Sequence, residues 1–163
     1  MSADGKLSDR TRSQVALSCA EDFDRVDRLR AESDAILVGV GTVIADDPYL
    51  TVKDDDLREE NGNPTRVVLD SRARTPEGAA VLDDAAPTVV AVTEAAPDGR
   101  LDALSERAAV LVTPTEDGRV DPRPLLDELD DRGVERLMVE GGGEVVASFL
   151  DAGLVDEVYV YIA

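Results

Sequence analysis

Short, nearly continuous apolar runs recur along this chain of 163 residues, and helical stretches separate them. The runs are rich in Val, Ile and Leu and hardly alternate with polar residues, which is typical of strands covered on both faces of a sheet. They occupy residues 35–40, 66–70, 88–92, 109–113, 136–140 and 157–162. Alternation of such strands with helices predicts an α/β domain with one mostly parallel sheet and helices on both faces.

Helix signals fill the intervals between these runs. Ser18 and Glu21 have the spacing of a capping box and predict a helix to about Glu32. Asp121 and Pro122 fit the N-cap and first position of a helix through residue 129. Two further helices are expected over residues 101–107 and 143–152, a charged loop over 54–63, and turns over 95–99 and 115–118.

We expect residues 1–163 to form a single domain that is truncated at both ends. The chain opens almost directly on a turn, Ala3-Asp4-Gly5, without a preceding strand, and it stops inside the run 157–162. The first and last strands of the domain are therefore expected to be missing.

Composition excludes several classes of function. The chain has no His and one Cys, Cys19, which excludes Ser-His-Asp machinery, His-bearing zinc sites and an internal disulfide. Its net charge of -19 argues against nucleic acid or an anionic membrane as a partner, because phosphate contacts need clustered cations. No apolar run reaches the length of a membrane span. We expect a cytoplasmic protein without a metal site that binds a small molecule.

The excess of acidic residues and the scarcity of lysine also indicate the salt concentration in which the protein works. Acids number 36, and only two of the 17 basic residues are lysines, Lys6 and Lys53. Many exposed carboxylates with few lysines favour a protein adapted to concentrated salt, where screening removes most of their repulsion. An ordinary acidic protein is the alternative. We also hypothesise that the two lysines face a phosphate-bearing ligand, the alternative being incidental surface lysines.

Three segments follow predicted strands directly, at the sheet edge where open α/β sheets bind ligands. In residues 38–48 (VGVGTVIADDP), Gly39 and Gly41 allow close backbone approach, and Thr42 is expected to cap a short helix whose N–H groups suit an anion. An ordinary strand-to-helix turn would have the same pattern.

The second segment, residues 137–146 (LMVEGGGEVV), carries three consecutive glycines at a helix start. It is neither a GxGxxG fingerprint nor a Walker A loop, yet it favours a pyrophosphate cradle over a turn needed only for packing. Glu140 lies at the end of the strand, where its carboxylate could accept hydrogen bonds from an amino-bearing ligand.

The third segment, residues 66–74 (RVVLDSRAR), holds three arginines in an otherwise acidic chain. Ser71, Arg72 and Arg74 follow the strand and would suit a phosphomonoester such as the 2′-phosphate of NADP. A solvated Arg–Asp turn is the alternative.

Taken in order, these segments resemble the pyrimidine reductases of riboflavin biosynthesis, a family with a dihydrofolate-reductase-like fold. The matching strings are SADGK (2–6), LRAESDAIL (29–37), GTVIADDPYLT (41–51), VLDS (68–71) and VEGGG (139–143). The TxxADDPxLT pattern is specific, whereas EGGG alone would not be. The match spans nearly the whole chain and implies a three-layer sandwich.

The resemblance implies that NADPH, or NADH in its place, delivers hydride to C1′ of a ribosylamino-pyrimidine 5′-phosphate and opens the ribose to a ribitylamino chain. Bacterial reductases of this family are commonly fused to a zinc deaminase with His and Cys ligands, and such a domain is absent from this His-free chain. The resemblance therefore favours a stand-alone reductase acting before deamination, as in archaea and fungi, on 2,5-diamino-6-ribosylamino-4(3H)-pyrimidinone 5′-phosphate. Such reductases typically form homodimers.

The resemblance also assigns the site residues. It places Thr42, Asp46, Ser71, Arg72, Gly142, Gly143 and Glu144 at the coenzyme. It places Ser13, Arg30, Leu50, Lys53 and Glu140 at the substrate. Lys6 and Asp47 are the catalytic candidates, because either could polarise the open-chain imine or assist its protonation. Hydride transfer to an imine mainly needs near-attack geometry, so the reaction can proceed without His.

Two other interpretations remain open. One is a different reductase of the same fold, such as a dihydrofolate reductase, although a chain without Trp and with 3% aromatic residues is short of the aromatic lining that a pteridine pocket usually has. The other is a non-catalytic nucleotide-binding domain.

Overall fold

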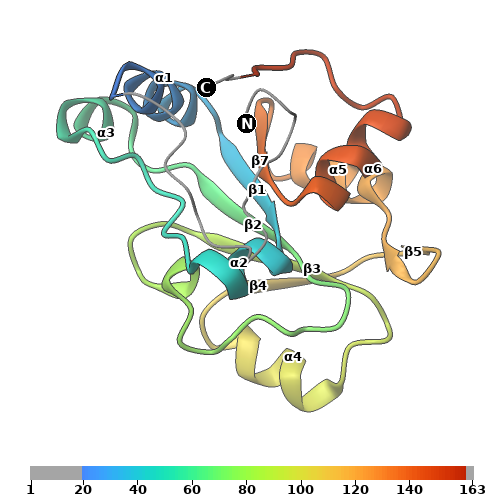
Figure 1. Cartoon of the computed structure of the whole chain (residues 1–163). Helices are drawn as coiled ribbons and strands as arrows, with labels where there is room; N and C mark the ends of the chain where they lie inside the picture. Colours follow the sequence, from blue (N-terminus) through green and yellow to red (C-terminus); the bar gives the residue numbers. More distant parts are fainter. Residues whose placement is uncertain (1–19, 161–163) are drawn as a thin grey trace.

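A five-stranded sheet forms the centre of the computed structural model, which describes residues 20–160 (Figure 1). The strand order is β4-β3-β2-β1-β7, and all neighbouring strands are parallel. The strands are β1 (Ala35–Gly39), β2 (Thr65–Leu69), β3 (Thr88–Val92), β4 (Ala109–Val112) and β7 (Leu137–Gly141). The chain steps outward from β1 to β4 and then returns to the other side of β1 with β7. The carboxyl ends of β1 and β7 therefore border the switch point at which open α/β sheets bind ligands.

Helices cover both faces of this sheet and make a three-layer sandwich. Ile36 and Val68 face a core completed by α2 and α4, whereas Leu37 and Val67 face a second core under α5 and α6. This division follows from the two-residue period of a strand, which sends successive side chains to opposite faces. The helices are α1 (Ala20–Ala31), α2 (Val40–Asp46), α3 (Asp55–Asn61), α4 (Asp98–Ser105), α5 (Pro122–Asp130), α6 (Gly143–Asp151) and the 3-10 turn η1 (Ala80–Leu82).

Five of the six predicted strands are confirmed, with bounds that differ by at most one residue. The strand predicted over residues 157–162 is wrong for its described part, because residues 157–160 form no strand. Val158, Tyr159 and Val160 are between 45% and 64% exposed. A β-branched run becomes a strand only where another strand supplies hydrogen-bond partners, and none pairs with it in the described part of the chain. The Arg25 guanidinium instead lies over the Tyr159 ring, 5.5 Å from its centroid.

The charged segment predicted as a loop over residues 54–63 contains helix α3, so that prediction is wrong. Asp54 is the N-cap, and its carboxylate accepts the backbone N–H groups of Asp56 and Leu57. Carboxylates in the first turn also suit the positive end of the helix dipole. None of the residues of α3 is buried, so the helix has no apolar stripe that would indicate it from sequence.

The turn predicted over residues 115–118 is part of a two-stranded antiparallel hairpin, and only its second half is the turn itself. Its strands are β5 (Thr115–Glu116) and β6 (Arg119–Val120). Asp117 and Gly118 both have positive φ, at 50° and 75°, which is the conformation that two-residue hairpin loops favour. The hairpin lies between β4 and α5 in the chain.

Candidate active site

Two glycine-containing turns pack against each other at the switch point. Gly39 ends β1 and begins α2, and Gly142 begins α6 after β7. A Cβ at Gly39 would lie 2.8 Å from Cγ2 of Val145, and one at Gly141 would lie 3.1 Å from Oγ1 of Thr42. Gly142 has φ +86°, a conformation that side chains rarely adopt. The contact between the two turns therefore depends on residues without side chains.

The amino end of α6 is open and lacks a capping side chain. Helices α3 and α5 begin with aspartate caps, Asp54 and Asp121, whereas the N-cap of α6 is Gly142 and makes no side-chain hydrogen bond. The first N–H groups of a helix have no acceptor within it and point to the positive end of its dipole. A Cβ at Gly143 would meet no atom of the described residues within 4 Å, so none of them blocks the approach of an anion to these donors. The turn fits a pyrophosphate group.

Thr42 does not cap α2 as predicted, because that position belongs to Gly39. Thr42 lies inside the helix, half-buried, with Oγ1 beside Gly141. It therefore joins the turn after β1 to the turn after β7. Asp46, assigned to the coenzyme with Thr42, is exposed in the last turn of α2.

The turn after β2 is linked to the same edge through the β5–β6 hairpin. The N–H of Val120 donates to Oγ of Ser71 at 3.2 Å, and the carbonyl of Ser71 accepts the N–H and hydroxyl of Thr93. Arg119, in the same hairpin, lies 3.5 Å from the Glu144 carboxylate in the first turn of α6. The hairpin thus bridges two segments that the sequence assigns to one coenzyme.

The three arginines of residues 66–74 do not form one cluster, because Arg66 lies apart from Arg72 and Arg74. Arg66 is fully buried near the amino end of β2, where it donates to Oγ1 of Thr88 and to the carboxylate of Asp83. The hydrogen bond to Arg66 holds the pKa of Asp83 below its ordinary value. Arg72 and Arg74 are exposed in the turn beyond the carboxyl end of the strand. The length of β2 therefore separates Arg66 from the two arginines that are close to it in sequence.

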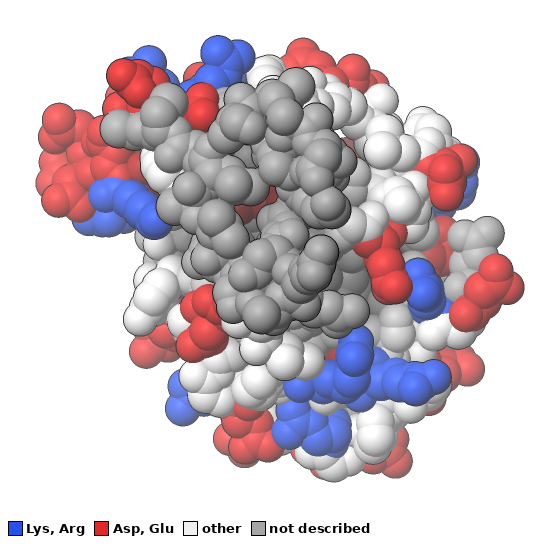
Figure 2. All heavy atoms as spheres, in the orientation of Figure 1, with Lys and Arg blue, Asp and Glu red and all other residues white. Residues whose placement is uncertain are grey.

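Asp70 shapes the turn that carries Arg72 and Arg74. One oxygen of this buried carboxylate accepts the N–H and the hydroxyl of Thr75, at 2.6 and 2.7 Å. The other oxygen has no hydrogen-bond partner among the described residues and lies 3.9 Å from Nε of Arg74. Arg100 of α4 donates to the backbone carbonyls of residues 73 and 75. Figure 2 shows one larger group of Lys and Arg atoms in the lower part of this face and smaller groups elsewhere, with acidic atoms in patches around the rim.

Arg30 and Glu140 form a bidentate ion pair beside the cradle, the glycine turn of residues 141–143 at the start of α6. The register between β1 and β7 shifts between Leu37 and Val38, which leaves Glu140 as the extra residue of a bulge. Bulges commonly re-aim a side chain beside a site. The Glu140 oxygens accept Nε and Nη2 of Arg30 at 2.6 and 2.7 Å, and Nη1 donates to the carbonyl of Thr51. Burial opposes the charge of Arg30, but the hydrogen bonds and charge of Glu140 outweigh it and raise the Arg30 pKa.

Asp27 is a residue at this site that sequence reasoning missed. It is 8% exposed, and its carboxylate accepts the N–H of Lys53 at 2.8 and 2.9 Å and the N–H of Asp54 at 2.6 Å. The available signal was a carboxylate one helical turn before Arg30 in the predicted helix. The Lys53 side chain itself is exposed.

The remaining assigned residues have different environments. Asp47 ends α2 in a left-handed conformation, with φ 42°, and its carboxylate accepts the N–H of Ala80 at 2.8 Å. Leu50 is 3% exposed and packs into the core beside α2, so only its backbone can face a ligand. Lys6 and Ser13 lie outside the described residues.

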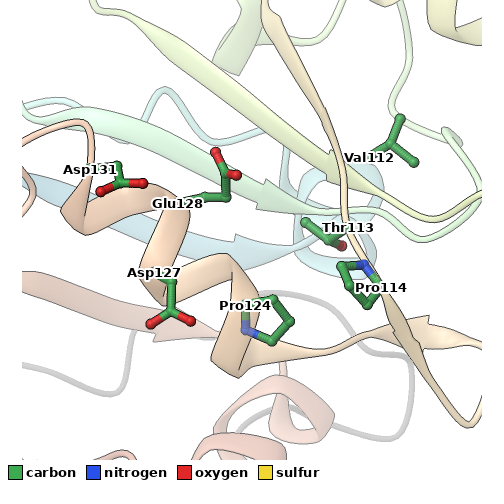
Figure 3. Close-up of a pocket in the computed structure, with 7 residues that line it drawn as sticks. All are labelled: Val112, Thr113, Pro114, Pro124, Asp127, Glu128 and Asp131. Atoms are coloured by element: carbon green, nitrogen blue, oxygen red, sulfur yellow. The ribbon is translucent and has the colours of Figure 1, made fainter.

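The cavity drawn in Figure 3 lies elsewhere, between the end of β4 and helix α5, and measures about 310 Å³. Its lining includes the carboxylates of Asp127, Glu128 and Asp131. Three negative charges disfavour a phosphorylated ligand, so we place the site at the switch point instead. Within residues 20–160, no group of three or more potential ligand side chains could hold a metal ion, and no helix is long and apolar enough to cross a membrane.

A parallel α/β sheet with glycine turns at its switch point is the arrangement in which open α/β folds bind ligands. The model of the RibD C-terminal domain matches residues 1–163, and the chain belongs to that family. Two curated relatives carry the name 2,5-diamino-6-ribosylamino-4(3H)-pyrimidinone 5′-phosphate reductase. The one from Archaeoglobus fulgidus is 51% identical over 98% of this chain and 75% of its own length. The one from Methanothermobacter thermautotrophicus is 51% identical over 100% of this chain and 74% of its own length.

Solved structures support the same fold. The chain resembles a pyrimidine reductase-like protein of Corynebacterium diphtheriae with a TM-score of 0.81 at 22% identity, covering 95% of this chain and 68% of that one. It resembles the Thermotoga maritima diaminohydroxyphosphoribosylaminopyrimidine deaminase/5-amino-6-(5-phosphoribosylamino)uracil reductase with a TM-score of 0.73 at 27% identity. That match covers 93% of this chain but only 39% of the bifunctional protein. The dihydrofolate-reductase-like α/β fold predicted from the sequence is confirmed.

Proposed function

We propose that this chain reduces 2,5-diamino-6-ribosylamino-4(3H)-pyrimidinone 5′-phosphate with a nicotinamide coenzyme, converting the ribosylamino group to a ribitylamino group. The observation that carries the proposal is that the residues assigned to the coenzyme and those assigned to the substrate meet at one switch point. Glu140 and Gly141 are consecutive in β7, and the first pairs with Arg30 while the second packs on Thr42. The names of the archaeal relatives agree with this function.

The coenzyme is proposed to lie along the carboxyl edge of the sheet. The open N–H groups at Gly142 and Gly143 would hold its pyrophosphate, with Thr42 and Ser71 beside it. When bound, the coenzyme supplies hydride to an electrophilic carbon. Because Glu144 lies beside Arg119, it contributes through its backbone N–H, whereas its charge is partly offset by the guanidinium.

NADPH is proposed as the preferred coenzyme. Arg72 and Arg74 are the exposed cations of the turn after β2, and guanidinium groups bind phosphomonoesters through charge-assisted hydrogen bonds. Arg72→Ala should raise the KM for NADPH and leave that for NADH within about twofold. Equal effects on both coenzymes would contradict a role at the 2′-phosphate.

Substrate is proposed to enter beside Arg30, Lys53 and Glu140. A carboxylate at Glu140 can accept hydrogen bonds from a ring amino group, and the exposed ammonium of Lys53 suits the 5′-phosphate. Asp47 and Lys6 remain the two candidates for proton transfer to the reacting nitrogen. Asp47→Asn should lower kcat with little change in substrate KM if its carboxyl carries the proton.

The decisive experiment is NADPH oxidation with the diamino-ribosylamino substrate in molar KCl, with the deaminated pyrimidine and dihydrofolate as alternative substrates. Turnover with the diamino compound supports the proposal and a place before deamination. Turnover only with another substrate would assign a different reductase of this fold. Tight NADPH binding without any turnover would favour a non-catalytic nucleotide-binding domain.

The protein is also proposed to be a cytoplasmic homodimer adapted to salt. The net charge of -19 and the acidic atoms on the face drawn in Figure 2 support the salt adaptation, because repulsion between them is weakest where the Debye length is short. Unfolding in low salt and in molar KCl tests this, and equal stability in both would contradict it. Light scattering in molar KCl measures the oligomeric state.

A further inference from the structure

We infer that Asp27 is a positioning residue that fixes Lys53 for the phosphate end of the substrate. Asp27 is 8% exposed on α1, and among the described residues its carboxylate hydrogen-bonds to the backbone and to no side chain. It accepts two consecutive N–H groups, those of Lys53 and Asp54. This inference rests on the proposed function, because it concerns how that substrate would be held.

The segment around Lys53 has no strand or helix of its own to hold it. Side chains from elsewhere bind its backbone instead. The N–H of Val52 donates to Oδ1 of Asn63, and Nη1 of Arg58 donates to the carbonyl of Val52. The N–H of Lys53 itself is bound by Asp27. Asp27 is therefore the contact that sets where the Lys53 side chain leaves the backbone.

Three of the acidic residues nearest Lys53 already have partners. Asp54 caps α3, Asp55 pairs with Arg58, and the Asp27 carboxylate is used by the two N–H groups. The structure records no ion pair for Lys53 with any described residue. In a chain this acidic, that arrangement leaves an exposed ammonium able to take an incoming phosphate.

Asp27 also ties Lys53 to the ion pair in the cradle. Arg30 lies one turn further along α1 and donates to the carbonyl of Thr51. The negative charge of Asp27, like that of Glu140, acts to raise the Arg30 pKa. Residues 51–54 are thus attached to α1 at two points, through Arg30 and Asp27. Because Arg30 holds Glu140, the two ends of the proposed substrate site are both attached to α1.

The test is a double-mutant cycle on the full chain in molar KCl, with Asp27→Ala, Lys53→Gln and the double variant. Lys53→Gln should raise the substrate KM by about tenfold because it removes the cation that binds the phosphate. Asp27→Ala should raise it by about as much because it displaces that cation. The KM for NADPH should change by less than about twofold. The double variant should resemble Lys53→Gln alone, because Asp27 acts through Lys53. Asp24→Ala, an exposed position on the same helix, is the matched control and should behave as the parent.

If the rise in substrate KM of the double variant equals the product of the two single rises, the inference is overturned. An equal rise of the KM for substrate and the KM for NADPH in Asp27→Ala would also overturn it. If Asp27→Ala does not fold, Asp27→Asn replaces it in the cycle, because the amide keeps one oxygen for the N–H groups and loses the charge. Absence of turnover in the parent protein would refute the proposed function and this inference with it. If the parent turns over but the two substitutions act independently, the inference is refuted and the proposed function stands.

Discussion

The ion pair between Arg30 and Glu140 gives the sharpest test of how the cradle is held. Glu140→Gln keeps the shape of the side chain but turns one acceptor into an amide donor that faces the guanidinium. Two charge-assisted hydrogen bonds of 2.6 and 2.7 Å are thereby reduced to one at most. We expect the folded protein to lose stability because Arg30 keeps its charge in a partly buried place.

The magnitude follows from burial. Removing one partner of a fully buried pair costs about 3–5 kcal/mol. The Arg30 and Glu140 side chains are 15% and 14% exposed, so water recovers part of this loss and we expect about 2–3 kcal/mol. A domain of this size shifts its Tm by about 2–4 °C per kcal/mol, so Tm should fall by about 5–10 °C.

The matched control is Glu32→Gln, which removes the exposed pair between Glu32 and Arg136. Those side chains are 58% and 50% exposed, and such pairs contribute at most about 1 kcal/mol. Thermal unfolding of both variants should be followed in low salt and in molar KCl. The loss in Glu140→Gln should persist in KCl, because a partly buried pair is screened less than a surface pair. Equal Tm shifts in the two variants would refute the reasoning.

Two further outcomes are expected. Gly39→Ala should destabilise the protein by about 1–3 kcal/mol and raise the KM for NADPH, since its Cβ would lie 2.8 Å from Cγ2 of Val145. In the control Gly41→Ala, the added Cβ would meet no atom of residues 20–160 within 4 Å, so neither stability nor affinity should fall. Chemical denaturation and coenzyme kinetics measure both effects. Asp83→Asn should cost stability near neutral pH, and this difference should shrink as pH falls below the ordinary value of 3.8. The pKa of Asp83 is lowered by Arg66, so its contribution is complete above that value and is lost as the carboxylate protonates. A constant difference down to pH ~2 would contradict the Asp83 pairing.

Much of the fold could be predicted because the strands are apolar throughout. A run such as residues 88–92 is recognisable by composition alone, and its bounds match β3. Helix α5 was indicated by Asp121 and Pro122, whose cap chemistry is local. Helix α3 could not be found this way, because its stabilisation is in the cap and the dipole and not in an apolar face.

The part of the site that consists of a glycine turn could be predicted from the sequence. The contacts between side chains and residues far away in the sequence could not. Glycines at 141–143 indicated an anion cradle directly. Spacing alone could not show that Arg66 is buried at the opposite end of its strand from Arg72. Nor could it show that Asp27 binds backbone N–H groups 26 and 27 residues away, since such contacts exist only once the chain has folded.

The position of β1 in the sheet has a consequence for how the protein is made. Strands β1 to β4 pair with their neighbours in chain order, so they can assemble as they are synthesised. The cradle forms only when β7 docks on β1, and the Arg30–Glu140 pair joins residues 110 positions apart. Contacts of such sequence separation form slowly and late in folding. A nascent chain would therefore build most of its sheet well before it could hold a coenzyme, and ligand binding would report on completion of the last described strand.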